Sequence, residues 1–187
     1  MVSPAKQIWK DFSSGKGGNV VSFLMEHEHF TFPEAIKFLA KKYNIEVEET
    51  QQTNEQKEAA SLRESMYAVT AFAQSYFSKI LTESEEGKNI GLSYFKERGF
   101  TDESIERFHL GYSPDEWTAL TNAATDAGFQ KEFLVSTGLT IEKGGKIFDR
   151  FKGRIMFPIH SMSGRVTGFG GRILKQDKQS AKYMNSP

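Results

Sequence analysis

The middle of the chain, from residue 48 to residue 58, reads EETQQTNEQKE and contains no apolar side chain. A stretch without apolar surface to bury gains nothing that would offset the entropy of ordering its backbone. We therefore expect a linker at residues 48–58, with a folded part on each side of it. The chain has 187 residues, 38% of them hydrophobic, and can supply a core for a small first part and a larger second part.

Residues 1–47 carry the signals of a short strand, a turn and two helices. The string KQIWKD contains β-forming residues and leads into the glycine-rich string SSGKGGN, which favours a turn. Asn19 is a competent N-cap for a helix that follows it. A second helix is expected from Thr31, because Thr31 and Glu34 have the spacing of a capping box. Asn44 is suited to end that helix in a left-handed conformation.

The second part, residues 59–187, changes from a helical to a β pattern along its length. Apolar residues recur at three-four spacing over residues 59–81, which predicts one long amphipathic helix. Shorter helices are expected at 89–97, 102–107, 115–127 and 130–136, and a short strand at 108–112, where Phe108, Leu110 and Tyr112 alternate. From Leu139 onward the pattern is that of β-strands. Helices followed by strands indicate the α+β class.

The formal net charge of the chain is zero, but its charges are unevenly distributed. Residues 143–187 hold ten Lys and Arg residues against two Asp and Glu residues, whereas residues 1–142 carry a net charge of −8. A basic segment interleaved with phenylalanine and glycine is typical of a surface that binds nucleic acid phosphates. A solvated basic face is the alternative interpretation.

Arg150, Lys152 and Arg154 stand at alternate positions in the string DRFKGRIMFPI. If this string is a strand, the three side chains share one face and can meet successive phosphates. The glycines of the string GFGGR would let the backbone approach a sugar–phosphate chain closely. An exposed edge strand that is protected by its charges is the alternative.

No local motif supports catalysis or metal binding. The string GKGGN lacks the Ser or Thr that follows Lys in a phosphate-binding loop, and GFGGR has the wrong glycine spacing for a dinucleotide fingerprint. The four histidines are not spaced as ligands of one metal, the acidic clusters at 46–49 and 83–86 lie in polar segments, and Ser13-Ser14 has no adjacent base. The absence of cysteine excludes disulfides, thiol catalysis and thiolate zinc sites.

The sequence contains no segment suited to a membrane. No apolar run approaches the roughly 20 residues that a membrane-spanning helix needs. The N-terminal string MVSPAKQIWKDF lacks the apolar core of a secretory signal. We therefore expect a cytoplasmic protein that has no membrane partner.

Three long strings span most of the chain: VSPAKQIWKDFSSGKGGNVVSFLMEHEHFTFPEAIKFLAKKYNIEVEE, YFKERGFTDESIERFHLGYSPDEW, and DRFKGRIMFPIHSMSGRVTGFGGRIL with AKYMNSP. Together they resemble the bacterial replicative DNA primases, the DnaG-type enzymes that lay RNA primers on single-stranded DNA. In that family a zinc ribbon is followed by a linker, by the N-terminal subdomain of the RNA polymerase region, and by a catalytic Toprim subdomain. The resemblance implies a degenerate half of the zinc ribbon with two helices at 1–47, a linker at 48–58, and the helical plus β N-terminal polymerase subdomain at 59–187.

The resemblance also implies which parts this sequence lacks. The family's Lys-Cys-Phe-x-Cys-Gly pattern corresponds to residues 10–15, where Asp11 and Ser14 stand in place of the two cysteines. Ser is a poor zinc ligand and Asp alone does not complete a tetrahedral site, so no zinc is expected. The sequence stops within the family's Lys-Tyr-x-Asn-Ser-Pro motif, before the Toprim residues that hold magnesium. We therefore expect no cofactor, no catalytic residue and no primer synthesis by these residues alone.

Residue by residue, the resemblance implies a DNA-binding surface at the basic end. The positions that match the family's template-guiding basic groove are Arg150, Lys152, Arg154, Arg172, Lys182 and Asn185. Lys152 stands where Arg is usual, which keeps the charge but loses bidentate geometry. Arg165 and Lys175 are weaker candidates. Phe151 and Phe169 could stack on bases, although their alternation with the cations favours packing in the core.

The expected function is non-catalytic binding of a single-stranded DNA template as part of a DNA primase, acting in primer synthesis for DNA replication. Phosphate contacts position a strand without reading its sequence, so low sequence specificity is expected. One alternative is a regulatory or docking module that contacts a full-length primase or a replicative helicase through the acidic helical part. A second alternative is a gene remnant without function, against which cooperative unfolding would argue.

Overall fold

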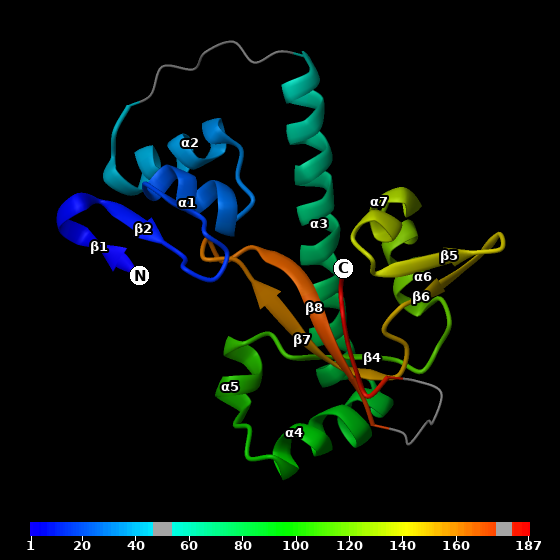
Figure 1. The fold of residues 1–187 in the computed structure, drawn as a ribbon. Coiled ribbons are helices and arrows are strands. Elements are labelled where there is room, and N and C mark those ends of the chain that lie inside the picture. The colour runs from blue at the N-terminus through cyan, green and yellow to red at the C-terminus, as the bar shows by residue number, and fades with distance from the viewer. Residues whose placement is uncertain (47–53, 175–180) are drawn as a thin grey trace. The chain divides into compact units, whose positions relative to one another are not determined.

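The computed structural model describes residues 1–46, 54–174 and 181–187. The chain divides into two compact units, Met1–Thr53 and Asn54–Pro187, and each has its own sheet (Figure 1). Residues 48–53 of the predicted linker lie outside the described residues. Residues 54–58 were also expected in the linker, but they form the start of a helix. Glu and Lys residues such as Glu55, Lys57 and Glu58 favour a helix without needing burial, so the lack of apolar residues was a poor guide there.

The first unit pairs a small sheet with two helices. Its strands are β1 (Val2–Ser3), β2 (Ile8–Lys10) and β3 (Gly17–Gly18), antiparallel and adjacent in chain order, with the 3-10 turn η1 (Pro4–Lys6) between the first two. The helices are α1 (Val20–His27) and α2 (Phe32–Tyr43). The short strand expected within the string KQIWKD and both expected helices are therefore confirmed.

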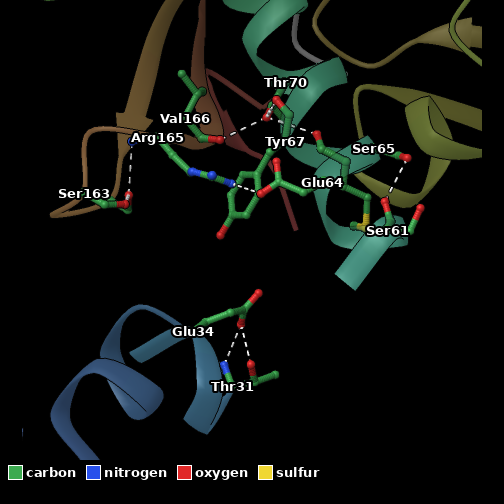
Figure 2. Close-up of polar contacts among 12 residues, drawn as sticks. Thr31, Glu34, Ser61, Glu64, Ser65, Tyr67, Thr70, Ser163, Arg165 and Val166 are labelled. Atoms are coloured by element: carbon green, nitrogen blue, oxygen red, sulfur yellow. Dashed lines mark hydrogen bonds and ion pairs between the residues drawn. The ribbon is translucent and has the colours of Figure 1, made fainter. Parts of the chain in front are cut away.

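Both helices of this unit begin at the caps that the sequence predicts. The Asn19 side chain accepts a hydrogen bond from the backbone N of Ser22 at 2.9 Å. Glu34 accepts hydrogen bonds from the backbone N and the hydroxyl of Thr31, as Figure 2 shows. Asn44 ends α2 with φ 53°, in the left-handed region where Asn is tolerated. Local side-chain chemistry thus fixes where α1 starts and where α2 starts and ends.

The second unit begins with the long helix α3 (Asn54–Glu83), which contains the predicted helix at 59–81. The helical elements that follow are the π-helix η2 (Gly87–Leu92), α4 (Ser93–Glu97), α5 (Asp102–Arg107), α6 (Ala119–Asp126) and α7 (Lys131–Ser136). The strands are β4 (Gly111–Ser113), β5 (Thr140–Lys143), β6 (Lys146–Asp149), β7 (Arg154–His160), β8 (Val166–Ile173) and β9 (Tyr183–Asn185). The α+β class expected from the sequence is confirmed.

The main sheet of this unit has the strand order β4-β7-β8-β9, with every pair antiparallel, while β5 and β6 form a separate hairpin. Figure 1 shows α3 running along this sheet, and Thr70 of α3 donates a hydrogen bond to the carbonyl of Val166 at 3.0 Å. Met156 points into the core that includes Phe77 of α3. Its neighbour Ile155 points to the opposite face, into the core that includes Phe95 of α4. The sheet is therefore covered on both faces.

Two expected elements are shorter than predicted. The strand expected at 108–112 begins only at Gly111, because His109 has a left-handed backbone with φ 49° and breaks the extended run. The helix expected at 115–127 begins only at Ala119. The carboxylate of Asp149 accepts a hydrogen bond from the backbone N of Leu120, which sets the start of that helix at this point.

Candidate nucleic-acid interface

The predicted row of three cations on one strand face is wrong. Strand β7 begins at Arg154, and residues 150–153 form a turn. Gly153 has φ +65°. This left-handed conformation is not that of a strand, so β7 cannot extend from Arg154 back to Arg150. The backbone N of Gly153 donates to the carbonyl of Pro114 at 3.0 Å, and that of Arg150 donates to Leu139 at 2.9 Å. The turn therefore directs Arg150, Lys152 and Arg154 to three different environments.

Arg154 is a buried residue, with 3% of its surface exposed. Its guanidinium donates to the carbonyl of Ala181 at 3.0 Å and lies 3.5 Å from that of Gly171. Burial lowers the pKa of this guanidinium. Arg154 thus ties the residues before β9 to the edge of β8, and the structure does not present its charge on the surface.

Arg172 of β8 lies between two tyrosines. Its guanidinium carbon is 5.0 Å from the ring centre of Tyr94 on α4 and 5.4 Å from that of Tyr183 on β9. The guanidinium also donates to the Tyr94 hydroxyl at 2.7 Å. Arg98 stacks on the same Tyr94 ring at 4.7 Å. These contacts order the Arg172 side chain while most of the Tyr183 surface remains exposed.

Lys182 and Asn185 are exposed at the two ends of β9. Asn185 pairs with Gly170 of β8, and the carbonyl of Lys182 accepts a hydrogen bond from the backbone N of Ile173 at 3.0 Å. The paired strands therefore bring Arg172, Lys182 and Asn185 to one edge of the sheet. We call Arg172, Lys182, Tyr183 and Asn185 the β8–β9 edge.

Arg150 lies where the C-terminal residues of the chain pack against the turn after α7. A Cβ atom built on Gly138, which has φ +67°, would clash with the Pro187 ring and would come within 3.6 Å of the Arg150 side chain. Ser186 anchors this segment, because its hydroxyl accepts a hydrogen bond from the backbone N of Phe169 at 2.7 Å. Arg150 is therefore beside Pro187, at the end of the segment that carries Lys182 and Asn185.

Lys152 occupies a separate place. Its ammonium group forms an ion pair with Asp115 at 2.5 Å and lies 4.7 Å from the ring centre of Trp117. Both charged side chains of the pair are about two-thirds buried or more. The positive charge of Lys152 is thus already balanced by a neighbour from the β4–α6 connection.

Arg165 and Lys175 are the two weaker candidates for DNA binding. Arg165 donates to Glu64 of α3 at 2.5 Å, and its guanidinium carbon lies 4.8 Å from the Tyr67 ring centre. Figure 2 draws the ion pair between Arg165 and Glu64. This ion pair ties the β7–β8 turn to α3, but both partners are largely exposed and the pair contributes little stability. Lys175 lies outside the described residues.

The glycines of GFGGR do not leave the backbone open to a sugar–phosphate chain. A Cβ on Gly168 would meet Ser186 at 3.1 Å, and one on Gly171 would meet the Phe151 ring at 2.6 Å. The chain's own side chains fill the space beside these glycines. The prediction that a sugar–phosphate chain approaches the backbone there is therefore wrong. Phe151 and Phe169 are each 1% exposed and belong to the core against α3, which confirms the core assignment for both.

Asp11 and Ser14 form a closed hydrogen-bonded turn in the first unit. The hydroxyl groups of Ser13 and Ser14 donate to the Asp11 carboxylate at 2.7 and 2.5 Å, and their backbone N atoms lie 3.0 and 3.3 Å from it. These hydrogen bonds hold the pKa of Asp11 well below its usual value, and the bond from the Ser14 hydroxyl has the largest effect. Both carboxylate oxygens are therefore occupied by the chain's own donors.

Comparison with known proteins assigns the chain to a family. Residues 76–187 match the family described as DNA primase catalytic core, N-terminal domain, and residues 1–55 match the CHC2 zinc finger family. The chain belongs to the DNA primase family. It is 37% identical to the DNA primase of Clostridium acetobutylicum over 189 aligned residues and 39% identical to that of Halalkalibacterium halodurans over 188. The alignments cover the whole chain but only 30% and 31% of these two relatives.

Solved primase structures have a similar fold. The zinc-binding and RNA polymerase domains of the Aquifex aeolicus primase match 100% of the chain and 43% of that protein, with a TM-score of 0.60 and 31% identity. The DnaG primase catalytic domain bound to single-stranded DNA matches 68% of the chain and 40% of that protein, with a TM-score of 0.62 and 31% identity. The primase resemblance seen in the sequence is therefore confirmed.

The residues present in the first unit do not fit the zinc ion that this family implies. The sequence has no cysteine, the Asp11 carboxylate is bonded by Ser13 and Ser14, and the ring of His27 stacks on Phe23 at 5.1 Å. Within residues 1–46, 54–174 and 181–187, no three His, Asp or Glu side chains are grouped closely enough to hold a metal. In the same ranges, no helix is long and apolar enough to cross a membrane.

Sequence reasoning missed three aromatic residues beside the candidate cations. Tyr183 adjoins Lys182 in the chain, so that position carried a usable signal. Tyr94 and Arg172 are 78 residues apart, and no local pattern links them. Trp117 contacts Lys152 only because the turn at Gly153 packs against the residues after β4.

Proposed function

We propose that this chain binds the single-stranded DNA template of a DNA primase along the β8–β9 edge. The observation that carries the proposal is the ordered Arg172, held between Tyr94 and Tyr183, with Asn185 on the adjacent strand β9 and Lys182 directly before that strand. An ordered guanidinium loses little conformational freedom when it meets a phosphate, and a neighbouring exposed tyrosine offers a face on which a base can stack. The related DnaG primase catalytic domain solved with single-stranded DNA supports the choice of ligand.

The residues of the proposed site have different roles. Arg172 and Lys182 supply charge to the phosphates, and Asn185 supplies hydrogen bonds. Arg150 extends the cationic surface beside Pro187. Arg154 and Lys152 act through structure: Arg154 holds the residues before β9, and Lys152 is paired with Asp115. Such contacts position a strand without reading its bases, so affinity is expected to depend little on sequence.

The proposal also concerns primer synthesis, which is an activity of a whole primase. The chain spans about 30% of the length of the curated primases that it matches. We propose that its contribution to primer synthesis is to hold the template while a nucleotidyl transfer occurs elsewhere in a primase, and that it acts in the cytoplasm. Contact with a replicative helicase or with a full-length primase stays a separate prediction.

The test is fluorescence anisotropy of a labelled single-stranded oligothymidylate, titrated with the chain across a series of salt concentrations. We expect binding at low salt and a linear decrease of log affinity with log salt, because each neutralised phosphate releases counterions. A blunt duplex of the same length serves as the comparison and should bind more weakly. Absence of binding at low salt would overturn the proposal.

A further inference from the structure

The turn at residues 11–16, between β2 and β3, is organised around one carboxylate. Oδ1 of Asp11 accepts hydrogen bonds from the hydroxyl of Ser13 at 2.7 Å and from its backbone N at 3.0 Å. Oδ2 accepts from the hydroxyl of Ser14 at 2.5 Å and from its backbone N at 3.3 Å. Each oxygen of Asp11 thus holds one residue of the turn by both its side chain and its backbone.

The base of the turn is closed as well. The backbone N of Asp11 donates to the carbonyl of Lys16 at 2.8 Å, directly beyond the paired strand residues Lys10 and Gly17. The ammonium group of Lys10 donates to the carbonyl of Gly15 at 2.7 Å. Gly15 has φ +74°, a left-handed conformation that lets the chain reverse its direction there. Hydrogen bonds therefore fix both ends of the turn and its tip.

Other contacts connect this turn and its strands to helix α1. The ammonium group of Lys16, at the end of the turn, forms an ion pair with Glu26 of α1. The indole N of Trp9, on β2, donates to the carbonyl of Asn19 at 3.1 Å. The Trp9 ring also meets the ring of Phe23 edge-on, with 5.5 Å between the ring centres. The sheet and α1 are therefore joined on both sides of the turn by side chains of the chain itself.

A structural zinc ion performs the same task in small domains, because it links segments that bury too little apolar surface to be stable alone. Residues 1–55 match the CHC2 zinc finger family, yet Asp11 and Ser14 stand where the primase pattern has cysteines. Two oxygens bound to one tetrahedral zinc ion, each about 2.1 Å from it, lie about 3.4 Å apart. The two side-chain oxygens of Asp11 and Ser14 are only 2.5 Å apart. They bond to each other and do not share an ion.

We propose that the hydrogen-bonded turn around Asp11 replaces the zinc ion as the clasp of the first unit, which folds without a metal. Thiolate zinc sites lose their metal to chelators and to oxidants of cysteine, whereas this turn has neither a metal nor a thiol to lose. Folding of the first unit is therefore independent of zinc supply and of reducing conditions. This role of the turn does not depend on whether the β8–β9 edge binds DNA.

The first test is urea unfolding of the whole chain with EDTA and with added zinc. The chain has two tryptophans, one in each unit, so Trp117→Phe leaves Trp9 as a reporter of the first unit. We expect one cooperative transition of Trp9 emission with the same urea midpoint in both conditions. A lower midpoint in EDTA, or a cooperative transition only with zinc, would overturn the proposal. So would elemental analysis that finds about one zinc ion per purified chain.

The second test removes the common acceptor of the turn. In the Trp117→Phe background, Asp11→Ala should lower the urea midpoint of Trp9 by roughly 0.5 M or more, the order expected when a capping acceptor is lost. Ser14→Ala removes one hydroxyl donor and should lower the midpoint less. Glu46→Ala is the matched control, since it removes an exposed carboxylate that follows α2. Equal midpoints for Asp11→Ala and Glu46→Ala would overturn the proposal.

A third measurement shows whether the effect of Asp11→Ala is confined to the first unit. Trp9→Phe leaves Trp117 as the only tryptophan, and its emission follows the second unit. Asp11→Ala in this background should leave the urea midpoint of Trp117 unchanged, because the bonds of the turn lie within the first unit. An equal decrease of the Trp9 and Trp117 midpoints would contradict a clasp that acts on the first unit.

Discussion

Thr121 donates two hydrogen bonds to Asp149, one from its backbone N at 3.1 Å and one from its hydroxyl at 2.5 Å. The backbone N of Leu120 donates a third to the same carboxylate at 2.7 Å. Asp149 is 4% exposed and belongs to β6, whereas Thr121 lies in the first turn of α6. A strand residue thus caps a helix that has no side-chain cap of its own, and it joins α6 to the hairpin that carries Phe148.

The Asp149 cap predicts a stability effect. Asp149→Ala leaves three donors at the start of α6 without their acceptor, so the free energy of unfolding should decrease by about 2 kcal/mol. Chemical denaturation in urea measures this change. Asp126→Asn, at the exposed end of the same helix, should change the free energy by less than about 0.5 kcal/mol. Equal effects of the two substitutions would show that the cap contributes little.

The burial of Arg154 predicts that its substitution disturbs the fold before it disturbs binding. Arg154→Met keeps much of the side-chain volume but removes the hydrogen bond to Ala181, so unfolding should become easier by about 2 kcal/mol. Arg107→Met, an exposed substitution at the end of α5, is the control. Unchanged stability of Arg154→Met, together with weakened DNA binding, would instead identify Arg154 as a direct phosphate ligand.

The contact between Tyr94 and Arg172 predicts a positioning effect. Tyr94→Leu removes one stacking face and the hydroxyl acceptor of Arg172, and affinity for oligothymidylate should decrease roughly 2- to 5-fold at low salt. Tyr94→Phe keeps the stacking and should lose less. If Tyr94→Phe and Tyr94→Leu both bind as the unsubstituted chain does, the order of Arg172 is irrelevant to binding.

The hydrogen bonds to Asp11 predict how the first unit responds to pH. Because the folded pKa of Asp11 is lowered, its contribution to stability is present above the usual pKa of 3.8 and is lost only as the pH falls through the lower folded value. NMR should therefore show constant amide shifts for Ser13 and Ser14 as the pH falls from 7 to 3.8. Movement of these shifts with a midpoint near 3.8 would contradict the bonded turn.

Asp11→Asn provides the control for this titration, because it keeps the size of the side chain and removes its charge. The Ser13 and Ser14 amide shifts of that variant should differ from those of the unsubstituted chain already at pH 7. Addition of zinc should leave the shifts of both proteins unchanged, since the donor set around Asp11 does not fit that metal. A zinc-dependent change confined to the unsubstituted chain would restore a metal site at Asp11.

The sequence predicted those features that depend on neighbouring residues. Two helix starts could be predicted, one from Asn19 and one from the pair Thr31 and Glu34. In both, the capping hydrogen bond joins residues only three positions apart. Asn44 ends its helix for a similarly local reason. These signals are complete within a few residues, so no tertiary contact was needed to read them.

The candidate site was less predictable because its geometry depends on distant contacts. The alternation of Arg150, Lys152 and Arg154 suggested a strand, but the left-handed turn at Gly153 separates them. Arg154 is buried because Ala181, which precedes β9, packs against it and accepts a hydrogen bond from its guanidinium. The partnership of Tyr94 with Arg172 joins α4 to β8 across 78 residues, which no periodicity shows.

The central claim is that the β8–β9 edge holds single-stranded DNA, and salt-dependent anisotropy of matched variants tests it most directly. Arg172→Gln with Lys182→Gln should weaken binding and reduce the magnitude of the log affinity against log salt slope by about 1.4, two phosphates at about 0.7 each. Lys79→Gln with Lys88→Gln, which removes the same charge elsewhere, should retain a steeper slope. Identical slopes and affinities for the two double variants would contradict the account.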